Sequence, residues 1–131
     1  MTKKSMPLSP HLGIYKPQIT SVLSISHRIS GVINFVGMLM LLWWIVYVSF
    51  STTDLTKNFM WEFFSTNQGM AILVAWSFSL FFHMCTGIRH LFWDIGIGFS
   101  LRAVSISGWM AVIAAIMLTA STWCIIFRII E

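Results

Sequence analysis

The sequence carries two groups of polar side chains inside apolar stretches, and the first contains a hydroxyl, an imidazole and a guanidinium. Spacings of three, four and seven residues put Ser24, His27, Arg28 and Gly31 on one face of a helix. An arginine that snorkels to lipid headgroups, with nearby serines bonded back to their own helix, explains Arg28 alone equally well. Together the three side chains favour a ligand that is polar at one end and apolar at the other. A quinone headgroup or the propionate edge of a haem has that character.

The second group runs from His83 to Asp94 and has the pattern HxxxGxRHxxxD. His83 lies six residues inside Arg89 in apolar sequence, where a free imidazole is costly, so it needs a partner. That partner is either a hydrogen-bonding group on a neighbouring helix or the iron of a haem. Gly87, one turn further along, would leave room for a flat macrocycle, and His90 returns to the same face.

His83 and His90 are not expected to bind one iron together. Seven residues of helix separate them by about 10 Å, whereas two axial nitrogens face each other across one iron at roughly 4 Å. A second axial ligand must then come from another helix. Because His27 lies near the end of its span, we predict that it is too shallow to face His83 and that another polypeptide supplies the ligand. Arg89 and His90 are expected nearer the membrane surface, close to propionates or a headgroup.

Composition indicates that the elements carrying these residues are embedded in lipid. Of the 131 residues, 57% are hydrophobic and 9% are charged, and the mean hydropathy of +0.83 leaves too little polar surface for a water-soluble protein. The eight Lys and Arg residues are too scattered to form a stripe that follows a phosphate backbone, so we expect no nucleic-acid partner.

The charged residues mark the membrane spans. Charge-free intervals cover residues 29–53, 63–88 and 103–127, and each exceeds the roughly 20 residues that a helix needs to cross a bilayer. We therefore predict an all-α membrane protein that forms a single domain over residues 1–131, with an irregular, proline-containing segment at 1–20. Three transmembrane helices are predicted at approximately 21–50, 67–94 and 103–128.

The basic residues predict that the N-terminus lies on the inner side of the membrane. Six of them fall on the N-terminal side and two on the opposite side, and inner loops carry the excess of Lys and Arg. The six are Lys3, Lys4, Lys16, Arg28, Arg89 and Arg102, and the two are Lys57 and Arg128.

Both polar groups resemble motifs of a known family. The patterns SxxHRxS at Ser24–Ser30 and HxxxGxRHxxxD at His83–Asp94 are similar to those of the large cytochrome b556-type membrane-anchor subunits of succinate dehydrogenase, respiratory complex II. The N-terminal residues 9–12, Ser-Pro-His-Leu, with Ile-Tyr at 14–15, add to the resemblance, whereas Met6 stands where many relatives carry Arg. The resemblance covers nearly the whole chain, although the third span contributes only its hydrophobicity.

The resemblance implies a shared haem. In this family the subunit packs with a second three-helix anchor subunit, and one haem b lies between the two chains with one axial histidine from each. The residue that matches the axial ligand is His83. His27 matches the family's histidine near the haem propionates, and the chemistry of Arg28 and His90 leads us to expect these two residues at or near the propionates as well. Asp94 matches the acid that closes the second motif. We expect it either to contact the residues that hold the haem rather than the haem itself, or to pair with an arginine.

The resemblance also implies a quinone site and soluble partners. Ser24 and Arg28 match residues that contact ubiquinone. Succinate is oxidised at FAD in a flavoprotein subunit, and electrons pass through the clusters of an iron–sulfur subunit to ubiquinone. The chain is then a subunit of succinate dehydrogenase, an enzyme of the respiratory chain and tricarboxylic acid cycle, without catalytic carbon chemistry of its own. Its membrane is the bacterial inner membrane or the mitochondrial inner membrane.

Two other functions remain open on the sequence. A fumarate reductase membrane anchor has the same architecture but works with menaquinone in the reverse direction. A three-helix membrane subunit without haem has the same spans but no cofactor.

Overall fold

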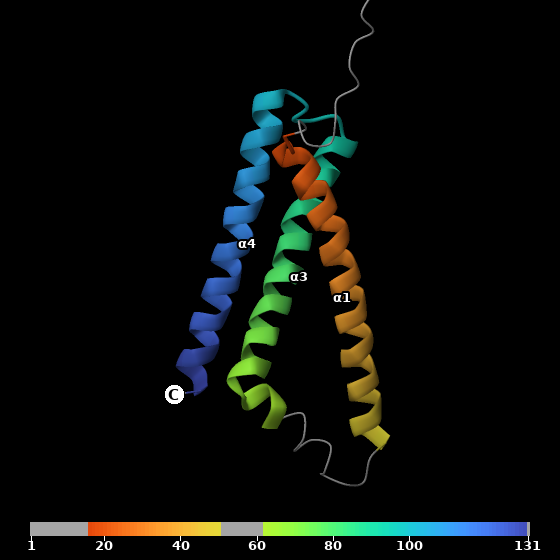
Figure 1. The fold of residues 1–131 in the computed structure, drawn as a ribbon, viewed down its shortest axis with the longest axis vertical. Coiled ribbons are helices and arrows are strands. Elements are labelled where there is room, and N and C mark those ends of the chain that lie inside the picture. The colour runs from red at the N-terminus through yellow and green to blue at the C-terminus, as the bar shows by residue number, and fades with distance from the viewer. Residues whose placement is uncertain (1–15, 51–61, 131) are drawn as a thin grey trace, which may run out of the picture.

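The computed structural model describes residues 16–50 and 62–130, which form three long helices (Figure 1). Each helix is long and apolar enough to cross a membrane, so the prediction of an all-α protein with three spans is confirmed. The helices start or end within two residues of the predicted ranges. They are α1 (Ile19–Phe50), α3 (Asn67–Asp94) and α4 (Leu101–Ile130).

The predictions for the N-terminal segment and for the orientation in the membrane largely concern residues outside the described part of the chain. Residues 1–15 of the predicted irregular segment lie outside the described part of the chain, and residues 16–18 precede the first turn of α1. Lys3, Lys4 and Lys57, which enter the charge count, also lie outside it. The inner position of the N-terminus therefore stays a prediction.

Local sequence explains where α3 and α4 begin. Thr66 caps α3, because its Oγ1 accepts a hydrogen bond from the backbone N–H of Gly69 at 3.1 Å. The connection to α4 contains Gly96 and Gly98 with φ angles of 83° and 87°, a backbone region that residues with a Cβ rarely adopt. Ser100 Oγ then accepts from the N–H of Ala103 at 3.3 Å in the first turn of α4. These features reverse the chain within a short loop and place α4 antiparallel to α3.

The helix α3 lies between the other two and contacts both of them (Figure 1). The contacts between α1 and α4 are far fewer, and the two helices diverge away from one end of the bundle. At that end α1 begins at Ile19, α3 ends at Asp94 and α4 begins at Leu101. We call it the junction end.

The interior of the bundle is unusually polar, and its outside is apolar. Most large hydrophobic side chains are exposed, as expected when lipid is the solvent. Polar side chains turn inward because hydrocarbon offers them no hydrogen bonds. The buried apolar residues are Leu23, Phe82, Ala111 and Ala115, and the buried polar residues are Ser30, Ser79, Thr86, Arg89 and Thr119.

Candidate functional site

Two of the predicted site residues meet at the interface of α1 and α3. The rings of His27 and His83 are stacked, with centroids 4.0 Å apart and an interplanar angle of 6°. The prediction that His27 is too shallow to face His83 is therefore wrong. His27 is eight residues from the start of α1 and His83 eleven from the end of α3, so their depths are about 12 and 16 Å and differ by less than one helical turn.

Hydrogen bonds on α1 determine which ring nitrogen of His83 is free. His83 Nδ1 lies 3.1 Å from the backbone oxygen of His27 and 3.1 Å from Ser30 Oγ, and the Ser30 hydroxyl donates to the same oxygen at 2.8 Å. A carbonyl oxygen only accepts, so Nδ1 carries the proton and donates. Nε2 then keeps its lone pair, and no described residue hydrogen-bonds to it.

This state of His83 is the one that a metal-binding histidine adopts. Ligating imidazoles usually donate their second N–H to a backbone carbonyl or carboxylate, which fixes the ring and makes the ligating nitrogen more basic. His83 is about 16 Å from the end of α3, near the middle of a bilayer whose hydrocarbon is about 30 Å thick. A lone pair at that depth fits the axial position of a haem iron.

The two glycines near these rings have different neighbours. A Cβ on Gly31 of α1 would lie 3.0 Å from Cε1 of His83, so the absence of a side chain makes room for that ring. A Cβ on Gly87 would lie 3.8 Å from Cε1 of His27, an ordinary contact. In this chain α1 brings the ring of His27 beside Gly87, and the prediction that this glycine leaves room for a flat macrocycle stays a prediction.

A buried hydroxyl orients His27. Thr86 is 1% exposed, and its hydroxyl donates to the backbone oxygen of Phe82 at 2.7 Å. Its Oγ1 is also 2.7 Å from His27 Nδ1 and therefore accepts the ring N–H. The ring of His90 lies 5.0 Å from that of His27, so His27, His83 and His90 form one group, which we call the imidazole cluster.

Sequence reasoning missed the hydroxyls that orient this cluster. Ser30 and Thr86 are each one helical turn from a histidine in the sequence, at +3 from His27 and from His83 respectively. Hydroxyl groups at that spacing within a membrane span are the signal that would have identified them.

Ser24 and Arg28 do not join the imidazole cluster. Ser24 is half-buried and Arg28 is exposed, and neither hydrogen-bonds to another described residue. Both belong to the first three turns of α1, at the junction end.

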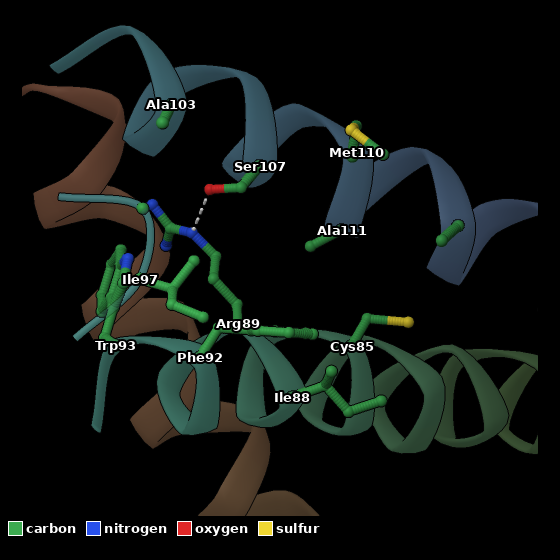
Figure 2. Close-up of a pocket in the computed structure, with 12 residues that line it drawn as sticks. Cys85, Ile88, Arg89, Phe92, Trp93, Ile97, Ala103, Ser107, Met110 and Ala111 are labelled. Atoms are coloured by element: carbon green, nitrogen blue, oxygen red, sulfur yellow. Dashed lines mark hydrogen bonds between the residues drawn. The ribbon is translucent and has the colours of Figure 1, made fainter. Parts of the chain in front are cut away.

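Arg89 turns away from the imidazole cluster towards α4. Its Nε donates to Ser107 Oγ at 3.0 Å (Figure 2). Its Nη2 donates to the backbone oxygen of Val104 at 2.8 Å. The guanidinium carbon lies 4.1 Å from the centre of the Trp93 ring. Asp94 is exposed and forms no ion pair within the described residues, so it is not the partner of Arg89.

Comparison with known proteins agrees with the resemblance that the two motifs carry. The sequence model of the family described as the succinate dehydrogenase/fumarate reductase transmembrane subunit matches residues 2–122 of this chain. The chain belongs to that family. It is 47% identical over 117 residues to the succinate dehydrogenase cytochrome b556 subunit of Rickettsia prowazekii, covering 89% of this chain and 90% of the relative. The b560 subunit of Marchantia polymorpha is 40% identical over 112 residues, covering 81% of this chain and 80% of the relative.

Family membership and the three apolar helices make the chain a multi-pass inner-membrane protein. The predicted relationship to the cytochrome b membrane anchors is confirmed. The third span, which carries none of the quoted motifs, lies largely within the matched residues as well.

Proposed function

We propose that the chain is the membrane-anchor cytochrome b subunit of a succinate:ubiquinone oxidoreductase, with His83 as one axial ligand of a haem b. The observation that carries this proposal is the free Nε2 of His83 at mid-membrane depth, with Nδ1 bound to the backbone oxygen of His27. The names of the relatives, succinate dehydrogenase cytochrome b subunits, support the same function.

The second axial ligand comes from the partner anchor subunit. Two ligands of one iron point their nitrogens at each other from opposite sides of the porphyrin. The rings of His27 and His83 instead lie face to face at 4.0 Å, which leaves no space for a macrocycle between them. His27 therefore orients His83 through its backbone oxygen and its ring and does not share the iron.

The remaining polar residues near the junction end serve the edge of the site. His90, whose ring centroid lies 5.0 Å from that of His27, and the exposed Arg28 would supply donors suited to propionates. His27, whose Nδ1–H donates to Thr86, would supply a second donor at Nε2 only when its ring is protonated. When bound, the haem supplies a one-electron redox centre. The residues of this chain hold it, and they fix the proton of the axial imidazole on Nδ1.

Ser24 and Arg28 contribute to ubiquinone binding at the same end of the bundle. A quinone carbonyl accepts hydrogen bonds, and a hydroxyl and a guanidinium without partners in the described chain can donate them. A site near the end of the spans admits an apolar tail from the bilayer and protons from water. The flavoprotein and iron–sulfur subunits that dock there carry FAD and the clusters, and this chain performs no step on succinate.

The decisive experiment replaces His83 by Ala in the complete, purified complex. We expect the low-spin b-type signal in the reduced-minus-oxidised spectrum to disappear or change its form. His90→Ala is the comparison variant, because it removes a proposed propionate donor from the same face of α3 but leaves the axial ligand in place, so the low-spin signal should persist. A normal low-spin spectrum in the His83 variant would refute the assignment.

A wild-type complex without haem absorption would select the anchor without haem. If the complex reduces fumarate with menaquinol in preference to oxidising succinate with ubiquinone, the fumarate reductase anchor would be selected.

A further inference from the structure

A cleft between α3 and α4 at the junction end is separate from the imidazole cluster. Its volume is about 390 Å³, within the range of roughly 300–1,000 Å³ that small-molecule sites occupy. Its lining is mostly apolar, and the lining residues of α4 include the small side chains of Ala103, Ala111 and Ala114 (Figure 2). Small residues along one face of α4 leave room beside the larger side chains of α3.

The cleft opens on the apolar outer surface of the bundle. Ile88 and Phe92 of α3 and Met110 of α4 line it, and their side chains are 47%, 52% and 63% exposed. Exposed apolar side chains at the rim indicate that a molecule enters from the bilayer and that its apolar part stays in contact with hydrocarbon.

A buried cation lines the same cleft. Arg89 is only 6% exposed, yet no ion pair joins it to an acidic side chain of the described residues. Its Nε and Nη2 have protein acceptors, but none of the described residues accepts from Nη1. Charge at membrane depth is costly unless an opposite charge lies close to it. An anionic acceptor at the polar end of the cleft would balance this charge and accept from Nη1.

A second donor adjoins this guanidinium. Trp93, which also lines the cleft, stacks on Arg89 at 4.1 Å, and its indole N–H has no acceptor among the described residues. A guanidinium and an indole N–H side by side suit a phosphate, which accepts several hydrogen bonds at once.

We propose that this cleft binds one anionic phospholipid, with its phosphate at Arg89 and Trp93 and an acyl chain along the alanines of α4. Charge complementarity selects the anionic lipid over a zwitterionic one, because the choline or ethanolamine cation would lie near the guanidinium. The lipid fills the space between α3 and α4 and neutralises the only cation that is buried in the described residues.

Native mass spectrometry of the purified complete complex tests the proposal. The complex is stripped with detergent and then exchanged into dioleoylphosphatidylcholine vesicles that contain dioleoylphosphatidylglycerol. We expect the wild type to retain one phosphatidylglycerol in preference to phosphatidylcholine. Ala114→Phe fills the cleft and should lower this retention about tenfold or more, while the haem spectrum stays unchanged. Ala120→Phe is the matched control, because Ala120 is exposed on α4 and does not line the cleft.

A second variant tests the polar end separately. Arg89→Gln should remove the preference for phosphatidylglycerol over phosphatidylcholine, whereas Arg102→Gln, at an exposed cation of the same end, should keep it. If Arg89→Gln does not assemble, Ala114→Phe alone decides the question. Equal retention of the two lipids by the wild type would overturn the proposal. Loss of a partner subunit from Ala114→Phe, with lipid retention unchanged, would also overturn it and assign the cleft to a protein contact.

Discussion

Gly31→Ala should disturb the haem site through one methyl group that contacts the axial ligand. The new Cβ would lie 3.0 Å from Cε1 of His83, whereas carbon atoms pack at about 3.5–4.0 Å, so the ring must shift by a few tenths of an ångström, up to about 0.5 Å. Displacement of that size equals the tolerance of about 0.5 Å within which functional groups must be held. We expect a lower haem content per complex and an altered low-spin spectrum.

Gly87→Ala is the matched control for this experiment. Its Cβ would meet Cε1 of His27 at 3.8 Å, an ordinary contact, so no ring has to move. Both substitutions gain about 1 kcal/mol of helix propensity, because both glycines are inside helices. Crowding of a packed interface costs about 1–3 kcal/mol and applies to Gly31 alone. We therefore expect the two variants to differ in thermal stability by about 1–3 kcal/mol, in favour of Gly87→Ala.

The measurements are the reduced-minus-oxidised spectrum, the ratio of haem to protein and a thermal melt of the purified complex. Equal haem content and equal spectra in the two glycine variants would refute the reasoning. That result would mean that the ring of His83 is not held against α1 in the assembled complex.

Three further substitutions test other contacts. Arg28→Leu should abolish most ubiquinone reduction but preserve flavin-dependent dye reduction, with Arg102→Leu as a control; equal loss of both activities would count against a quinone contact. Ser30→Ala removes one acceptor from Nδ1 of His83 and so makes Nε2 less basic. We expect a potentiometric titration to show a haem midpoint potential raised by about 20–60 mV, which is the equivalent of one hydrogen bond of about 0.5–1.5 kcal/mol. An unchanged or lower potential would contradict that bond. Gly37→Leu overlaps the indole of Trp76 and should destabilise the α1–α3 interface by about 1–3 kcal/mol in a thermal melt, and an unchanged melt would show that the two helices do not pack there.

The spans could be predicted well because lipid imposes a simple rule on the sequence. An ionised side chain is costly in hydrocarbon, so Arg28, Glu62 and Arg128 mark the limits of the charge-free intervals that the three helices contain. The observed start of α1 and both ends of α4 lie two residues beyond the predicted ones, because helices continue past the hydrocarbon into the interface. His83 was also identified from the sequence alone, since an imidazole at that depth requires a partner.

The relations between helices could not be predicted in the same way. In water an apolar stripe shows which face of a helix is buried, but in lipid the outside is as apolar as the interior. Nothing in the sequence thus indicated that α3 presents His83 and Thr86 to α1 while it presents Arg89 to α4. His27 was predicted to be too shallow because it lies near the start of its span, but α3 brings His83 to within one helical turn of the same depth.

The sequence by itself determined the number of spans, the family and the histidine that needs a partner at membrane depth. Tertiary structure alone decided which nitrogen of His83 is free, because the acceptors of Nδ1 are the His27 backbone oxygen and Ser30 on a different helix. It also decided that Gly31 rather than Gly87 adjoins the ligand. The physical reason is that composition and charge select the solvent of each helix, whereas close packing between antiparallel helices selects its neighbours.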